Sequence, residues 1–182
     1  MRKGVTENSI RVDGGIAYIS VESKSRSFEG EAIIDLSDLP KIIVLGRKWH
    51  AGWNETTQQF FARANDKING VWAAIMLHRF LTDAPKGLDV DHVNHVMLDC
   101  RRENMRVCTR GENLQNRRGA MCTSSSGIRG VWFDKSRGKW TAEIKVNYKK
   151  IFLGRFDSMD LAREVVEDAR AANMPFSSEC RG

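Results

Sequence analysis

The sequence predicts an α+β protein built from short strands and a few helices. The strand signals are alternating apolar and polar residues, or aromatic and β-branched runs, bounded by polar turns. A helical period of apolar residues appears near the C-terminus. A length of 182 residues, with 41% hydrophobic and 29% charged side chains, suits a soluble globular protein of one ordinary domain or two or three small ones. We expect a β-rich N-terminal region over 1–65, a domain over 66–118, a linker over 119–126 and a C-terminal domain over 127–176.

The N-terminal region is expected to contain a β-hairpin over residues 16–35. GIAYISVES alternates apolar and polar residues, and AIIDL supplies the return strand after a polar turn. The following piece, DLSDLPKIIVL, fits either a short helix or a strand, because Pro40 interrupts it.

Three aromatic and apolar runs follow, at residues 49–53, 60–64 and 71–81. They favour strands separated by polar turns such as NDKING at 65–70. The last run is also compatible with the start of a helix that carries His78 and Arg79.

The domain over 66–118 is expected to contain a strand, a loop, a second strand and a helix. LDVDHV predicts a short strand, NHVMLDCRRE a loop and NMRVCT the second strand. Thr109 and Glu112 stand three residues apart at the start of TRGENLQNRR, which is the spacing of a capping box that begins a helix.

The C-terminal domain is expected to be a three-stranded antiparallel sheet covered by one helix. RGVWFD, KWTAEIKV and KIFLGRF predict its strands, with turns at KSRG and NYK. Ser158 is a candidate N-cap, after which one helical face carries five apolar residues: Leu161, Ala162, Val165, Val166 and Ala169.

Positive charge is concentrated in one part of the chain. Residues 101–155 hold 14 basic and 4 acidic side chains, whereas residues 1–100 hold 12 basic and 13 acidic ones, and residues 156–182 hold 3 basic and 6 acidic ones. This local excess suits a polyanion such as nucleic acid better than a merely solvated basic surface.

Composition also argues against several classes of protein. No apolar run approaches the ~20 residues of a membrane span, and MRKGVTENSI lacks the apolar core of a signal peptide, so we expect a cytoplasmic location and no membrane partner. The four cysteines form no C-x-x-C pair, which favours reduced thiols over a zinc site.

The segment from 90 to 116 gathers groups that suit phosphodiester chemistry. Asp91 offers a carboxylate and Asn113 an amide oxygen, both hard ligands suited to Mg²⁺ or Mn²⁺. His92 can accept a proton from water near neutral pH. Neighbours on a regular strand point to opposite faces, so Asp91 and His92 can serve one site only if the strand ends or twists there.

The pattern D-H, then E-N-x-R-V-C-T, then E-N-x-x-N-R resembles the HNH endonucleases of phages and mobile introns, in the homing-endonuclease branch. The resemblance implies a ββα-metal (His-Me finger) core in which His92 is the general base and Asn104 braces the hairpin and orients that histidine. It implies that Asp91 and Asn113 ligate the metal. Three further positions match as support for the site: His78, Arg79 and Asn116.

Some positions in this segment leave alternatives open or depart from the family pattern. His78 fits a role beside the active site or the DNA backbone, or simple packing. Cys100 stands where the family usually has asparagine, which removes an amide that could hold the loop. Met105 replaces leucine, a volume-conserving change.

Residues 126–173 resemble the DNA-binding domain of plant ethylene-response factors, the Apetala-two type, through Arg129-Gly130-Val131, Lys139-Trp140 and Leu153-Gly154 among others. The resemblance implies a sheet that lies in the major groove. Period-two alternation puts Glu143 and Lys145 on the DNA side, while Trp140 fits either a core position or a DNA contact. The expected DNA-binding residues are Arg129, Trp132, Lys135, Arg137, Trp140, Glu143, Lys145 and Lys150.

Together these features predict a DNA endonuclease that depends on Mg²⁺ or Mn²⁺ and cuts double-stranded DNA, in the cytoplasm of a phage-infected or bacterial cell. One active site per chain favours nicking, by a monomer or a dimer. The alternative is a DNA-binding regulator that keeps the nuclease fold without its activity. An RNA-directed role is disfavoured, because the RNA major groove is too narrow for a sheet.

Overall fold

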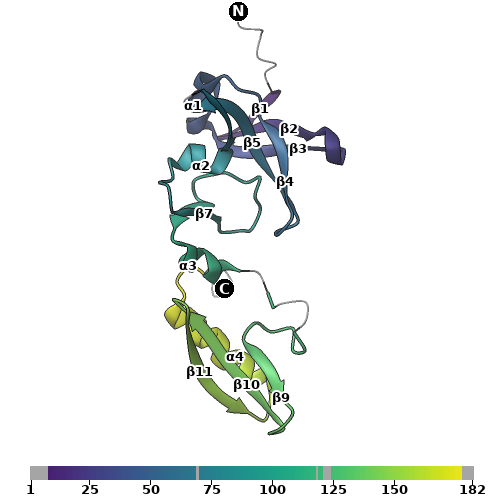
Figure 1. Cartoon of the computed structure of the whole chain (residues 1–182), viewed down its shortest axis with the longest axis vertical. Helices are drawn as coiled ribbons and strands as arrows, with labels where there is room; N and C mark the ends of the chain where they lie inside the picture. Colours follow the sequence, from purple (N-terminus) through teal and green to yellow (C-terminus); the bar gives the residue numbers. More distant parts are fainter. Residues whose placement is uncertain (1–7, 69, 118, 121–123, 178–182) are drawn as a thin grey trace, which may run out of the picture. The chain divides into compact units, whose positions relative to one another are not determined.

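The computed structural model describes residues 8–68, 70–117, 119–120 and 124–177 (Figure 1). The chain divides into two compact units, Met1–Val107 and Cys108–Gly182. Strands dominate both units and a few helices accompany them, which is the mixed composition that the sequence predicts. Within the described ranges, every helix is too short or too polar to cross a membrane.

The first sheet of the N-terminal unit has the order β1–β2–β3 and is antiparallel. β2 (Ile16–Ser23) and β3 (Phe28–Asp35) form the predicted hairpin. Every second residue of β2 is buried from Ala17 to Val21, as its sequence pattern requires. β1 (Ile10–Asp13) was not predicted, because all four of its side chains are exposed and carry no pattern of burial.

The ambiguous segment after β3 is helical. A 3₁₀ turn (η2, Leu36–Asp38) leads into α1 (Leu39–Leu45). Pro40 lies in the first turn of α1, where a missing N–H is tolerated. Gly46, at a φ of 58°, ends the helix in the left-handed conformation.

The second sheet has the order β4–β5–β6 and leads into a short helix. β4 spans His50–Asn54, β5 Gln59–Ile68 and β6 Val71–Met76. The turn predicted at 65–70 was wrong for its first four residues, because β5 continues to Ile68 and pairs with β6. The helix α2 (Leu77–Thr82) follows β6 directly, so the run at 71–81 is a strand and then a helix.

One core joins these sheets to the third element of the unit, a two-stranded sheet of β7 (Asp89–His92) and β8 (Met105–Cys108). Ile19 and Ile34 from the first sheet, Trp49 and Leu77 share this core with Cys100 from the loop between β7 and β8. Burying these apolar side chains together fixes the β7–β8 loop against the N-terminal sheet.

The C-terminal unit begins with α3 (Arg110–Asn113), which continues as a 3₁₀ turn (η3, Leu114–Asn116). The predicted capping box is present, since the side chains of Thr109 and Glu112 each accept from the other's backbone N–H. The α-helical part is shorter than the sequence suggested.

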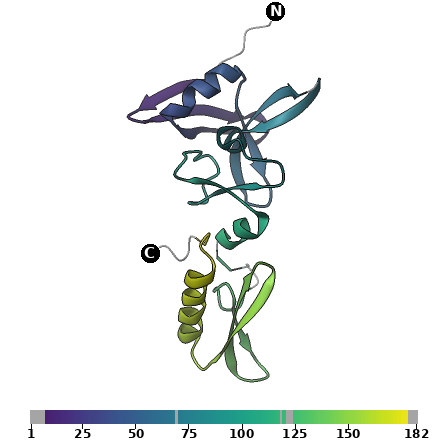
Figure 2. The ribbon, with the colours of Figure 1, turned by 90° about the vertical axis from the view of Figure 1, so that its left-hand side faces the viewer.

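A three-stranded antiparallel sheet of order β11–β10–β9 follows, from β9 (Val131–Asp134), β10 (Lys139–Val146) and β11 (Lys149–Phe156). The helix α4 (Met159–Asn173) covers one face of this sheet (Figure 2). Ser158 caps α4 by accepting a hydrogen bond from Asp160 N. Ala162 and Val166 are buried against the sheet, but Leu161, expected on the same face, is 52% exposed.

Candidate active site and nucleic-acid face

Asp91 and His92 lie at the end of β7, and both are buried, with 7% and 6% of their surface exposed. Arg106 on β8 donates to Asp91 Oδ2 from Nε at 2.8 Å and from Nη2 at 2.7 Å. His92 lies beside His78 and Cys100 instead. β7 ends at His92, which is the condition under which adjacent residues of one strand can serve one site.

Asn104 holds the two ends of the β7–β8 loop together. Its Oδ1 accepts from the backbone N–H of Asn94 at 2.9 Å, and its Nδ2 donates to the carbonyl of Asp99 at 2.7 Å. Its own carbonyl accepts from Val93 N at 2.8 Å, directly after His92. Asn104 is 5% exposed, so these bonds are shielded from water and fix the backbone that carries His92.

A buried carboxylate organises the middle of the same loop. Asp99 accepts from Arg101 through both oxygens, at 2.8 and 2.7 Å, and from Asn94 Nδ2 at 2.8 Å. Burial would raise the pKa of Asp99, but the hydrogen bonds from Arg101 and Asn94 outweigh it and hold that pKa below its usual value. The loop therefore contains a permanent carboxylate near neutral pH.

The N-terminal sheet holds this loop from outside. Ile33 N donates to Leu98 O at 2.8 Å, and Cys100 N donates to Ile33 O at 2.7 Å. Arg102 donates to both oxygens of Asp38, at 2.9 and 2.6 Å. The region before residue 65, for which the sequence indicated no chemistry, thus supports the loop that carries the motif.

His78 and His92 form an edge-to-face pair of rings, with centroids 5.3 Å apart and planes at 79°. Burial is the main cause that lowers the pKa of His78 to about 4, and His92 and Arg79 add to it. Burial also lowers the pKa of His92, although the charges of Asp91 and Asp99 oppose it. Both imidazoles are therefore neutral at pH 7, so His92 can accept a proton.

Cys100 occupies the position where the family pattern has asparagine. Its Sγ lies 3.9 Å from His92 Nε2 and 3.8 Å from the carbonyl of Met97. Burial, together with Asp99, raises the pKa of its thiol to about 12, so it stays protonated at neutral pH. A weak S–H donor therefore stands beside the candidate base in place of an amide.

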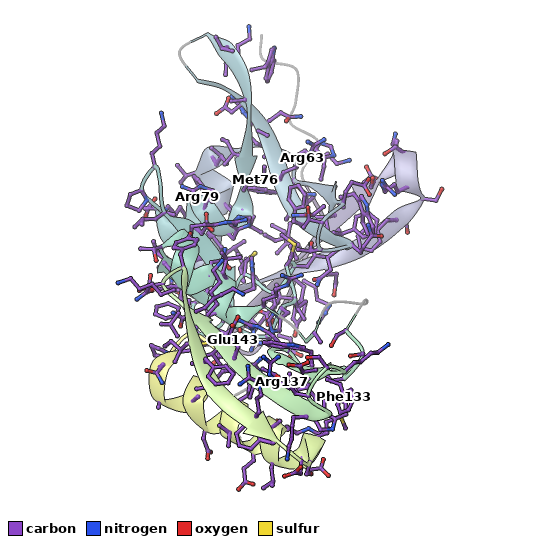
Figure 3. All side chains as sticks on the ribbon, turned by 60° about the horizontal axis from the view of Figure 1, so that its bottom comes forward. Arg63, Met76, Arg79, Phe133, Arg137 and Glu143 are labelled. Atoms are coloured by element: carbon purple, nitrogen blue, oxygen red, sulfur yellow. The ribbon has the colours of Figure 1, made fainter. Side chains whose placement is uncertain are left out.

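Arg79 supports the chain that leads into β7. Its guanidinium donates to the carbonyls of Leu88 at 2.7 Å, Ala84 at 3.1 Å and Pro85 at 3.0 Å. Figure 3 labels its side chain on α2. Arg79 therefore stabilises the backbone that precedes β7, and none of these three hydrogen bonds reaches Asp91 or His92.

Asn113 belongs to the C-terminal unit, whereas Asp91 and His92 belong to the N-terminal one. Asn113 ends α3 and is half-buried, and Asn116 in the following turn is 3% exposed. Because the two residues belong to different units, each described separately, the expectation that Asp91 and Asn113 share one cation stays a prediction.

The oxygen donors suit a hard divalent cation. Asp91 supplies a carboxylate and Asn113 an amide oxygen, and neither is a soft ligand. The described residues contain no group of three or more His, Cys, Asp or Glu side chains arranged for a metal. A cation on Asp91 would have to share its carboxylate with the guanidinium of Arg106.

The face of the C-terminal sheet opposite α4 carries several of the predicted DNA-binding residues. Glu143 and Lys145 alternate on β10 with Ala142 and Ile144, which are buried in the core. Figure 3 labels Glu143 on this sheet and Arg137 in the turn before it. Trp132 (41% exposed) and Lys150 share this face, because they pair in register with Thr141 and Lys145.

Two predicted residues have other surroundings. Trp140 is half-buried against the core on the helix side, with its ring 5.1 Å from that of Phe133. Arg129 is half-buried and donates to the backbone carbonyls of Leu114 and Gln115 in η3 and of Arg117 directly after it. Lys135 and Arg137 are exposed in the turn between β9 and β10.

Phe152 and Arg155, which the sequence did not indicate, lie on the same face opposite α4, which we call the open face. Phe152 is 54% exposed and pairs in register with Glu143, while Arg155 pairs with Thr141. The guanidinium of Arg155 lies 5.0 Å from the ring centroid of Phe152. A β-bulge between Ala142 and Glu143 shifts the register here, so simple alternation along β11 could not have placed both residues.

Residues 79–115 match a family model described as HNH endonuclease. The match spans Asp91, His92, Asn104 and Asn113, and it suggests nuclease function for this part of the chain. No curated protein and no solved structure matches the chain.

Proposed function

We propose that this protein is a divalent-metal-dependent HNH endonuclease of the homing type that nicks double-stranded DNA. The observation that carries the proposal is the β7–β8 hairpin inside the matched segment. There a neutral, buried His92 follows a buried Asp91, and the hydrogen bonds of Asn104 fix the loop backbone directly after His92. The ββα-metal core is the fold that this arrangement supports best.

His92 takes the proton from the attacking water in this mechanism. Its low pKa keeps the ring neutral at pH 7, and the bonds of Asn104 hold the strand end that carries it. The packing of His78 against His92 restricts the orientation of the ring. The products are 5′-phosphate and 3′-hydroxyl ends.

Asp91 and Asn113 would hold the Mg²⁺ or Mn²⁺ ion. When bound, such an ion supplies positive charge that stabilises the scissile phosphate and the leaving oxygen. Arg106 holds the carboxylate of Asp91 in a fixed orientation until then.

The open face of the C-terminal sheet would bind the DNA duplex. Lys145 and Lys150 offer cations for phosphates, and the exposed rings of Trp132 and Phe152 offer flat surfaces for sugars and thymine methyl groups. This face belongs to the chain segment in which the positive charge is concentrated.

A plasmid-nicking assay tests the proposal. Supercoiled DNA incubated with the protein should convert to the open-circular form with Mg²⁺ or Mn²⁺ and should stay supercoiled with EDTA. The nicked ends should be ligatable, because they carry a 5′-phosphate and a 3′-hydroxyl. No conversion with either ion would refute the enzymatic proposal.

One observation favours a second candidate, a DNA-binding regulator with an inactive nuclease fold. Arg106 binds the same oxygen of Asp91 through two nitrogens, so a guanidinium already neutralises the expected metal ligand. The regulator predicts tight binding to a specific duplex, unaffected by divalent ions, together with intact plasmid in the nicking assay.

A further inference from the structure

Arg129 joins the helical segment that carries Asn113 to the C-terminal sheet. Its Nη1 donates to the carbonyls of Gln115 at 3.0 Å and Arg117 at 2.9 Å, and its Nη2 donates to the carbonyl of Leu114 at 3.3 Å. These carbonyls end the helical segment, where the last C=O groups have no partner within the helix. One guanidinium therefore caps the segment.

The backbone of Arg129 is itself fixed to the β9–β11 sheet and α4, which together form the C-terminal module. Arg170 of α4, which is 4% exposed, donates to the carbonyl of Arg129. Glu143 N donates to the carbonyl of Gly130 at 2.9 Å. A Cβ at Gly130 would lie 2.3 Å from Glu143 O, at a φ of +84°, so only glycine fits this close approach.

Other contacts hold the same segment within the C-terminal unit. Gln115 is 6% exposed, and its Oε1 accepts from the backbone N–H of Phe176 at 3.2 Å. Gly111 lies against the ring of Tyr148, where a Cβ would be 3.7 Å from the ring. The segment after Val107 is thus part of the C-terminal unit, although the motif places Asn113 in the nuclease domain.

We propose that Arg129 is a positioning residue that holds the Asn113 segment on the C-terminal module, and not a DNA contact. The inference rests on the proposed function, in which Asn113 is a metal ligand and the module binds DNA. A guanidinium that reached for a phosphate would leave up to three carbonyls without their donor. The DNA-binding module thereby fixes the position of one metal ligand through this side chain.

Hydrogen exchange and DNA affinity together test the role of Arg129 in the full-length protein. Arg129→Ala removes the guanidinium, and Arg129→Lys keeps the charge but cannot reach three carbonyls at once. Both variants should exchange the amides of residues 109–117 at least about tenfold faster than wild type. Both should bind duplex DNA in EDTA within about twofold of wild type, because the open face of the sheet is intact.

Lys145→Ala is the matched control, since it removes an exposed cation from the sheet face. It should weaken DNA binding and reduce its salt dependence without changing exchange over 109–117. Unchanged exchange in both Arg129 variants would overturn the inference, as would a loss of affinity in Arg129→Lys equal to that of Lys145→Ala. Neither readout needs DNA cleavage, so a wild-type protein that fails to nick refutes the proposed function alone.

Where nicking occurs, the Arg129 variants add a second readout. The Mg²⁺ concentration that gives half the maximal rate should rise in both, because the amide of Asn113 is no longer held. A lower rate with an unchanged Mg²⁺ dependence would contradict a role in placing the ligand.

Discussion

Acid should destabilise the N-terminal unit through His78. Burial, His92 and Arg79 hold the pKa of this imidazole at about 4, whereas the unfolded chain titrates near 6.5. As the pH falls, the unfolded chain takes up the proton first, so protonation favours unfolding. The contribution of neutral His78 to the free energy of unfolding is fully present above pH 6.5. It is lost as the pH drops toward the pKa of about 4 that His78 has in the folded protein.

The size of the effect follows from the same two pKa values. A fall from 6.5 to about 4 corresponds to about 3 kcal/mol if the whole interval is titrated. The ring is partly exposed, and solvent screening reduces this figure, so we expect about 2 kcal/mol between pH 7 and 4.5.

Urea unfolding of wild type and His78→Phe at pH 7, 6, 5 and 4.5 measures this contribution. Other acid-sensitive groups act equally in both proteins, so the difference between the two curves isolates His78. A phenyl ring keeps the edge-to-face contact with His92, and Nδ1 of His78 has no hydrogen-bond partner among the described residues that would be lost. His50→Gln, at a half-buried position, should reduce the pH dependence of the free energy of unfolding less than His78→Phe does. Parallel curves for wild type and His78→Phe from pH 7 to 4.5 would refute the reasoning.

Two further predictions concern ion pairs around the motif. Asp38→Asn weakens the bidentate contact with Arg102, so it should lower the free energy of unfolding in urea by about 1–2 kcal/mol and slow nicking, whereas Asp83→Asn, in an exposed pair, should change both far less. Equal effects of the two changes would contradict support of the loop by the N-terminal sheet. Arg106→Ala leaves Asp91 buried without this partner, so its free energy of unfolding in EDTA, measured by calorimetry, should be about 2 kcal/mol lower than that of wild type. Mg²⁺ should then raise the free energy of unfolding more in this variant than in wild type. The same Mg²⁺ response in both proteins would argue against Asp91 as a ligand.

Local patterns in the sequence predict much of the fold. The alternation in GIAYISVES and the apolar run AIIDL predict the β2–β3 hairpin, although β3 begins at Phe28, inside the expected turn. The Thr109–Glu112 spacing predicts the start of α3. β1 escapes prediction because none of its residues is buried, and β5 is longer than expected because its polar residues pair with β6. Sheet pairing between distant strands can extend an element through residues that by themselves indicate a turn.

The partners of charged residues could not be predicted from the sequence. Arg102 forms an ion pair with Asp38, and Arg106 forms one with Asp91. Arg129 donates to backbone carbonyls that no local sequence pattern indicates as its acceptors. Each of these contacts depends on the three-dimensional arrangement of segments that are separate in the chain. The motif predicts which residues carry the chemistry, and only the structure shows what holds them.

The most direct test of the nuclease account is the nicking rate of His92→Ala under saturating protein with Mg²⁺. We expect a fall of at least about 100-fold relative to wild type, since the variant lacks its general base. DNA affinity in EDTA should stay within about twofold of wild type, because the sheet face is untouched. A variant that binds DNA and nicks it at the wild-type rate would contradict the assignment of His92.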